Sequence, residues 1–247
     1  LGSYAYAFLG GVIFNLANLI IVAAISIAGM SVAFPIGIGT ALILGVLVNF
    51  ISTPIGNPYY LFLGVFFIVL AILIDAIAYK FHLEGKTNSS NTGIVISLTG
   101  GILMGLFYRF VALSMSSNFK NPENGLFTPY SALLIFSSGI FISNFIWNTY
   151  FMYKPLQGDK VTFKNYILNS TLKTHLIGIL GGIIWCIGMS LSLISSEKAG
   201  YPISYGLGQG ATMVAAAWGV FVWKEFRGAT YKTNILISLM FFMFVSG

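Results

Sequence analysis

The chain has 247 residues, of which 57% are hydrophobic and only 7% are charged, and its mean hydropathy is +0.89. Soluble domains carry about 25% charged residues, so this composition excludes a soluble protein and predicts an integral membrane protein. The net charge of +6 does not indicate nucleic-acid binding, because the basic residues fall between the apolar stretches and not along one polar face. The single cysteine, Cys186, excludes an internal disulfide and a cysteine metal cluster.

Eight apolar stretches follow one another along the chain, and a helix needs about 20 residues to cross the hydrocarbon core. They cover approximately 4–28, 31–52, 58–81, 93–116, 127–151, 175–196, 202–223 and 231–247. No soluble domain fits between them, since the longest connection, 152–174, is predicted as a loop. We therefore expect one transmembrane domain over 1–247, an all-α polytopic bundle of eight membrane helices.

One segment of the sequence recurs. AGMSVAFPIGIG at Ala28–Gly39 matches AGYPISYGLGQG at Ala199–Gly210, and the pair Gly10-Gly11 has the same offset from the pair Gly181-Gly182. The two copies are an odd number of spans apart, so the second copy enters the membrane from the opposite side. Inverted repeats of this kind are typical of secondary transporters, which bind substrate between their halves.

The number of spans before each copy differs. Two spans, 93–116 and 127–151, precede the later copy, whereas none precedes the earlier one. We therefore expect a ten-helix parent of five plus five helices, with two N-terminal helices absent from this chain. On this interpretation, 4–81 is the remainder of the first inverted repeat and 93–247 is the second.

Lysine and arginine gather on one side of the predicted membrane. Two, Lys120 and Lys198, fall on the side of residue 1, and nine fall on the other side. The nine are Lys80, Lys86, Lys154, Lys160, Lys164, Lys173, Lys224, Arg227 and Lys232. By the positive-inside rule we expect residue 1 outside and the basic loops in the cytoplasm, in a plasma membrane or bacterial inner membrane.

Three segments carry a family resemblance. They are GGVIFNLANLIIVAAISIAGMSVAFPIGIG at Gly10–Gly39, GGILMGLFYRFVALSM at Gly100–Met115 and SYGLGQGATMVAAAWGVFVWKEF at Ser204–Phe226. These patterns resemble the drug/metabolite transporter superfamily, and within it they are most similar to the branch of ureide permeases and bacterial glucose/ribose/rhamnose porters. The resemblance implies a ten-helix carrier of five plus five inverted repeats for a small polar metabolite. The family's first two helices have no counterpart here, so no binding residue is carried over.

Arg109 is the most distinctive polar side chain within the spans. It lies about 7 Å from the midpoint of 93–116, at 1.5 Å per residue, and an arginine at a span centre costs about 2.5–3.5 kcal/mol. Gly101, Gly105 and Arg109 share one helix face, on which the glycines favour close packing. Arg109 is therefore a candidate for substrate binding; the alternatives are snorkelling outward or pairing with a carbonyl or Tyr108.

Asparagines form the second group of candidates. Asn15 and Asn18 share a helix face, and so do Asn144 and Asn148, with Trp147 adjacent. An amide offers donors and acceptors without net charge, which suits the hydroxyls of a sugar or the edges of a ureide or nucleobase. The alternative is an interhelical hydrogen bond, worth about 0.6 kcal/mol.

Three further sets complete the predicted site. Trp185, like Trp147, is a candidate apolar wall of a binding pocket, or else an interfacial tryptophan. Gln209 stands where the first copy has Ile38, so it is a candidate substrate contact or a helix-packing amide. The candidate hinges, where glycine or proline loosens the helix, are Pro35, Gly37, Gly39, Gly206, Gly208 and Gly210.

The acidic residues and the missing motifs limit the chemistry. Asp75, Glu197 and Glu225 lie towards span ends, so we expect interfacial carboxylates and not a proton relay. The sequence has no Ser/His/Asp set, HExxH motif, DxD pair or Walker loop, and we predict no catalytic residue, metal or cofactor.

We interpret the chain as a secondary carrier that moves a sugar, ureide or nucleobase by alternating access. Its expected partners are the solute and the lipid bilayer; a coupling ion, H⁺ or Na⁺, and a homodimer stay open. The alternatives are a non-transporting receptor or assembly subunit, a drug or amino-acid exporter of the same superfamily, or an intramembrane enzyme whose reactive groups lie on the missing helices.

Overall fold

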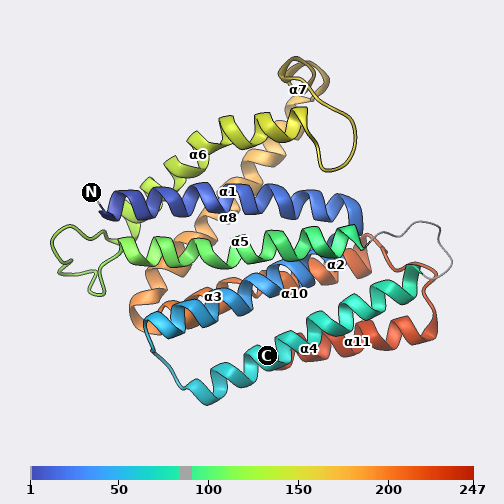
Figure 1. The fold of residues 1–247 in the computed structure, drawn as a ribbon, viewed down its shortest axis with the longest axis horizontal. Coiled ribbons are helices and arrows are strands. Elements are labelled where there is room, and N and C mark those ends of the chain that lie inside the picture. The colour runs from blue at the N-terminus through green and yellow to red at the C-terminus, as the bar shows by residue number, and fades with distance from the viewer. Residues whose placement is uncertain (1, 84–90) are drawn as a thin grey trace.

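The computed structural model describes residues 2–83 and 91–247, and within these ranges every regular element is a helix (Figure 1). Lys86, one of the basic residues counted above, lies outside the described residues. Six helical stretches are long and apolar enough to cross a membrane. They are α1 (Gly2–Ala28), the run Met30–Ser52, α4 (Pro58–Leu83), α5 (Thr92–Ser114), α6 (Pro129–Tyr153) and α8 (Leu172–Ala199). The prediction of a helical, multi-pass membrane protein is therefore confirmed.

The structure differs from the predicted spans towards the C-terminus. The stretch 202–223 is not one helix: it divides into α9 (Tyr201–Gly208), a turn, α10 (Ala211–Ala217) and the π-helix η2 (Trp218–Val222). The turn falls among three closely spaced glycines, each of which costs a helix about 1 kcal/mol relative to alanine. The stretch 231–247 forms α11 (Tyr231–Ser246), whose 16 residues fall short of a full crossing. Eight uninterrupted membrane helices are thus not confirmed, and the predicted loop 152–174 contains the short helix α7 (Phe163–Asn169).

The run Met30–Ser52 is also interrupted. It consists of α2 (Met30–Ala33), the π-helix η1 (Phe34–Ile38) and α3 (Gly39–Ser52). Pro35 lies in the first turn of η1 and has no N–H to donate, which accounts for the widened turn at this point. Each copy of the repeated sequence therefore lies in a broken helix.

The repeated Ala-Gly pairs adopt the same backbone conformation. Gly29 has φ 85° and ψ 164°, and Gly200 has φ 79° and ψ 155°, in the region that favours glycine. Each of the two glycines donates its N–H to the carbonyl four residues earlier, at 2.9 Å, and its own carbonyl accepts from the N–H four residues later, at 3.0 Å. Figure 1 shows the break after α1 and the break after α8 at opposite ends of the bundle.

The helices pack around the two broken runs. The helix α5 lies between α1 and α3, and α4 pairs with α11. The run α9–α10 lies alongside α3 and η1, with α9 against α3 and α10 against η1 and α2. The helix α8 is peripheral. In its most apolar 18-residue segment 11% of the residues are buried, whereas in the corresponding segment of Met30–Ser52 the share is 56%.

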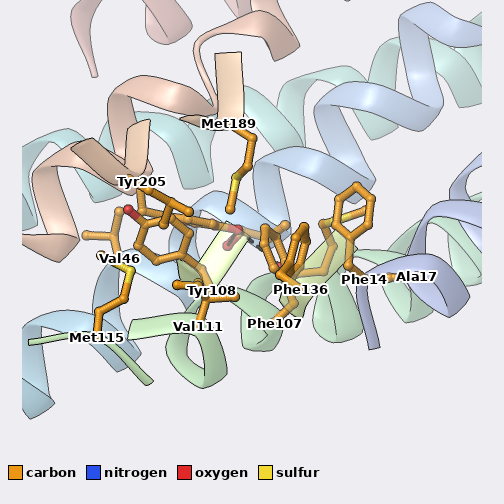
Figure 2. Close-up of a cluster of buried hydrophobic side chains, with 14 residues drawn as sticks. Phe14, Ala17, Val46, Phe107, Tyr108, Val111, Met115, Phe136, Met189 and Tyr205 are labelled. Carbon is orange, nitrogen blue, oxygen red and sulfur yellow. Dashed lines mark hydrogen bonds between the residues drawn. The ribbon is translucent and has the colours of Figure 1, made fainter. Parts of the chain in front are cut away.

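Two groups of buried side chains hold this arrangement together. The aromatic core, shown in Figure 2, includes Phe14, Phe107, Tyr108, Phe136 and Tyr205 and joins α1, α5, α6 and α9. The second core joins α2, η1, α4 and α11. Its members include Val32, Ile36, Ile68, Ala71, Ala78, Phe226, Ile237, Met240 and Phe244.

Candidate functional site

A cavity of about 540 Å³ lies between the two broken helices, and we call it the α3–α9 cavity. It is bounded by α3 and α4 from the N-terminal part of the chain and by α9, α10 and α11 from the C-terminal part. Its volume is in the range typical of small-molecule sites. Its lining is mostly apolar, with a few polar side chains that include Asn57, Gln209 and Thr212.

Thr212 is the buried polar group of this lining. Its side chain is 1% exposed, and its hydroxyl has no hydrogen-bond partner among the described residues. Buried hydroxyls are normally paired, so this unpaired hydroxyl, which is enclosed in the cavity wall, is a candidate partner for a ligand. Gln209 lies at the turn between α9 and α10 and is half-buried, so its amide offers further donors and acceptors.

The predicted hinges occupy different surroundings. Gly206 and Gly210 line the α3–α9 cavity, and a Cβ on Gly208 would meet its nearest neighbour at 3.4 Å. Gly37 and Gly39 are tightly packed: a Cβ would lie 2.5 Å from Ile21 or 2.9 Å from Ile72, respectively. The glycines of the second copy are therefore less tightly packed than Gly37 and Gly39, and Pro35 in the first copy is also buried.

Arg109 lies outside this cavity. It is half-buried on α5 and close enough for its charge to act on Tyr201, the first residue of α9. The ring of Tyr201 is 6.4 Å from that of Tyr108. Arg109 is thus placed at the start of a broken helix, near the end of the bundle where α1 begins.

The predicted asparagines separate into two places. Asn15 is 5% exposed and donates from Nδ2 to the Ser143 hydroxyl at 3.0 Å and to the Ile140 carbonyl at 3.4 Å, which ties α1 to α6. Asn18 is exposed on α1. Asn144 and Asn148 line a separate cavity of about 190 Å³ between α6 and α7.

Neither tryptophan lines the α3–α9 cavity or the cavity that holds Asn144 and Asn148. Trp185 stacks on Phe14 with ring centroids 4.6 Å apart and is 39% exposed. Trp147 is half-buried, and its Nε1 has no hydrogen-bond partner among the described residues. Of the predicted substrate-binding residues, Gln209 is the one that lines the α3–α9 cavity.

Sequence reasoning missed Tyr205, which links three helices. Its ring is 1% exposed, and its hydroxyl donates to the carbonyls of Ala41 at 3.1 Å and Met104 at 3.3 Å. Gly45 makes room for this ring, since a Cβ there would lie 2.1 Å from Tyr205 Cε1. No local sequence pattern predicts this contact, because its partners are far apart in the sequence.

A group of hydroxyls at the α8–α9 junction was also missed. The Ser204 hydroxyl is 2.9 Å from that of Ser195 and donates to the carbonyl of Ser192. The Tyr108 hydroxyl lies near the same serines but has no hydrogen-bond partner of normal geometry among the described residues. The spacing of Ser192, Ser195 and Ser196 on one helix face was the available signal.

Comparison with known proteins identifies relatives of this chain. A model of the ureide permease family matches residues 80–247. Ureide permease 2 of Arabidopsis thaliana is 30% identical over 159 residues, which are 62% of this chain and 39% of that protein. Ureide permease 1 of the same plant is 28% identical over 162 residues, which are 64% of this chain and 40% of that protein.

A further relative comes from another organism. Transmembrane protein 144 homolog B of Dictyostelium discoideum is 27% identical over 154 residues, which are 62% of this chain and 38% of that protein. The matched segments thus span about two fifths of the curated relatives. No solved structure matches the chain.

Proposed function

Because the chain belongs to the ureide permease family, we propose that it is part of a secondary transporter that moves a small, neutral, polar solute across a membrane by alternating access. The observation that carries this proposal is the α3–α9 cavity. It lies between two antiparallel broken helices, and its wall holds the unpaired hydroxyl of Thr212. Membrane carriers commonly bind their substrates between such interrupted helices.

The chemistry of the cavity favours a neutral solute. Among the described residues, the side chains that line it include amides and hydroxyls but no Asp, Glu, Lys or Arg. The amide of Gln209 matches the C=O and N–H edges of a ureide or nucleobase, and the hydroxyl of Thr212 can donate or accept one bond. A ureide is the preferred candidate, with nucleobases and sugars next, since two of the three named relatives are ureide permeases.

We also propose the five-plus-five inverted repeat of the drug/metabolite transporter superfamily. Its support comes from corresponding glycine pairs. In the earlier copy, a Cβ on Gly11 would lie 2.1 Å from the Phe136 carbonyl, and one on Gly10 would lie 2.9 Å from Val111, so α1 packs closely on α6 and α5. In the later copy, a Cβ on Gly181 or on Gly182 would meet nothing within 4 Å among the described residues.

The repeat indicates what covers that open face. The helices α5 and α6, which pack on α1, are the first two helices of the second half. In the proposed repeat, the helices that correspond to α5 and α6 are the first two helices of the first half, and these would pack on α8. We propose that these two helices precede residue 1 in the full-length protein and pack on the Gly181-Gly182 face of α8. The orientation expected from the basic residues, with residue 1 outside, belongs to the same proposal.

Transport is tested with the full-length protein reconstituted in liposomes. We expect saturable uptake of one member of a panel of ureides, nucleobases, sugars and amino acids. Saturable binding without flux would instead make the protein a receptor.

The cavity is tested with Thr212→Val, which keeps the shape of the side chain and removes the hydroxyl. Loss of one hydrogen bond worth about 0.5–1.5 kcal/mol raises the solute Kd by about 2- to 12-fold. The control is Thr99→Val, because that hydroxyl is exposed on α5 and bonds to its own helix. An unchanged Kd for Thr212→Val would remove the α3–α9 cavity as the binding site.

A further inference from the structure

A second hollow, of about 340 Å³, lies between η2 and α11, and we call it the η2–α11 groove. Among the described residues, it shares none of its lining with the α3–α9 cavity, and the proposed function does not use it. The helix α11 runs along the edge of the bundle beside α4 (Figure 1). Phe221, in the groove wall, is exposed. The groove therefore opens towards the surroundings of the protein.

One end of the groove is cationic. Lys224 and Arg227 line it, and both side chains are exposed. They stand on one tight turn, because the Arg227 N–H donates to the Lys224 carbonyl at 2.9 Å. Lys224 has φ 55°, in the left-handed region that residues other than glycine and asparagine rarely adopt. An uncommon backbone conformation thus places the two cations together, and such conformations cluster at functional sites.

The nearest acidic residue in the sequence does not neutralise these cations within the groove. The Glu225 carboxylate accepts from the backbone N–H groups of Met30 at 2.8 Å and Ser31 at 2.7 Å, and also from the Ser31 hydroxyl. It thereby caps the start of α2. A Cβ on Gly29 or on Gly219 would lie 2.8 Å from its Oε2, so these glycines make room for it. In the part of the chain that the structure describes, no Asp or Glu lines the groove.

The groove becomes apolar with distance from the cations. Asn234 and Ser238 line it near the start of α11 and share one face of that helix. Phe241 lies ten residues after the first residue of α11, about 15 Å along the helix. Its ring stacks on that of Phe221, with centroids 5.8 Å apart and an angle of 22° between the planes. The groove thus has a cationic end, a polar middle and an aromatic end.

Two exposed aromatic residues mark the level of the cationic end. Trp223 directly precedes Lys224, and Tyr231 is the first residue of α11. Tryptophan and tyrosine are enriched where a membrane protein meets the headgroups of the lipids. The cations therefore lie at headgroup depth, and the two stacked phenylalanine rings lie at the depth of the acyl chains. A phospholipid has the same order of chemistry, with a charged phosphate above apolar chains.

We propose that the η2–α11 groove is a binding site for one anionic phospholipid. The planar guanidinium of Arg227 pairs with the phosphate through two parallel N–H donors, and Lys224 adds a second positive charge. The amide of Asn234 donates to the headgroup, and an acyl chain lies against Phe221 and Phe241. Basic pockets between membrane helices bind acidic headgroups in this way.

The inference needs the membrane location of the chain and not the transport function. The orientation proposed above places this end of the bundle at the cytoplasmic leaflet, which carries anionic lipids. The turn that holds Lys224 and Arg227 also carries Glu225. It therefore joins a lipid on the outside of the bundle to the start of α2 inside it.

The experiment measures the fluorescence anisotropy of a dye-labelled phosphatidylglycerol added to the full-length protein in detergent micelles. Unlabelled phosphatidylglycerol should displace the probe, whereas phosphatidylcholine should displace it much less. We expect Lys224→Gln combined with Arg227→Gln to weaken binding about 30-fold, which corresponds to about 2 kcal/mol at 1.4 kcal/mol per tenfold. The matched control is Lys160→Gln combined with Lys164→Gln, because it removes the same charge from two exposed residues on the same predicted side. We expect less than a 2-fold change in the control.

A further variant tests the chain-binding part of the groove. Ser238→Phe places a ring in the groove and keeps both cations, while the Ser238 hydroxyl bonds only to its own helix, at the Asn234 carbonyl. We expect it to weaken binding at least about 5-fold. Unchanged binding, or displacement of the probe by millimolar glycerol 3-phosphate, would instead indicate a site for soluble anions and overturn the lipid site.

The wild-type protein supplies a test that does not depend on the folding of any variant. Added salt should weaken the binding of phosphatidylglycerol, because salt screens exposed charges. Equal affinity of the wild type for phosphatidylglycerol and phosphatidylcholine would overturn the proposal, and so would equal losses in the two double variants. Flux of solute through the reconstituted protein is a separate measurement, so a failure here leaves the transport function standing.

Discussion

Among the described glycines, Gly11 is the one where an added Cβ would lie nearest to the backbone of a neighbouring helix, at the point where α1 crosses α6. A Cβ on Gly11 would lie 2.1 Å from the Phe136 carbonyl oxygen and 2.9 Å from the Ile140 nitrogen, and a Cβ on Gly139 would lie 2.3 Å from the Phe8 carbonyl oxygen. Gly11→Ala must therefore push the two helices apart, because these atoms belong to the backbone and cannot rotate away. Overpacking of this kind costs about 1–3 kcal/mol.

A neighbouring hydrogen bond adds to this loss. Asn15 lies one turn further along α1, and its bond to Ser143 weakens when the helices separate, at about 0.6 kcal/mol. We therefore expect Gly11→Ala to lower the free energy of unfolding by about 2–3 kcal/mol, the upper part of the overpacking range. The assay is SDS titration of the purified chain in mixed micelles, followed by circular dichroism.

The repeat supplies a matched control. Gly182 corresponds to Gly11, but a Cβ there would meet nothing within 4 Å in the part of the chain that the structure describes, so Gly182→Ala in the same chain should change stability by less than about 0.5 kcal/mol. If the two proposed N-terminal helices cover α8 in the full-length protein, both variants should be destabilising there. Equal, small effects of the two variants in the 247-residue chain would refute the packing argument.

Two further predictions concern polar contacts of the bundle. Asn15→Ala should lower the free energy of unfolding by about 0.6 kcal/mol, whereas Asn18→Ala, at an exposed position, should leave it unchanged in the same assay. A loss of solute binding without a loss of stability would instead place Asn15 in the substrate pathway. Tyr205→Phe should cost about 1 kcal/mol, because the ring still fills its space while the bonds to the Ala41 and Met104 carbonyls are lost, and unchanged unfolding would contradict that role.

Hydropathy predicted the membrane class and most helices because each span is a continuous apolar run, but it could not detect interruptions. The stretch 202–223 has a high average hydropathy, so it was predicted as one span. The structure nevertheless has a turn at Gln209-Gly210, which divides the stretch into two helical parts. The Ala-Gly repeat was more informative. It marked two positions, Gly29 and Gly200, that share one backbone conformation.

The site residues were harder to predict because a membrane helix is apolar on every side. Sequence alone does not tell which face of α4 meets the bundle, so the burial of Asp75 was missed. The asparagines were assigned to the substrate site because they are polar residues within apolar spans. Polarity alone does not say which helix or cavity a side chain faces in the folded protein. Asn15 bonds across to α6, whereas Gln209 lies at a cavity on the other broken helix.

The contact between Glu225 and the start of α2 has a consequence for biosynthesis. The donor at Met30 and the acceptor at Glu225 are 195 residues apart in the chain. At about 5–20 residues per second, the ribosome needs roughly 10–40 s to synthesise that interval. During this time α1 and α2 are already in the membrane without the carboxylate that joins them to the C-terminal helices. The first broken helix therefore receives this cap only after the later helices have been synthesised, and truncation before Glu225 leaves it without the cap.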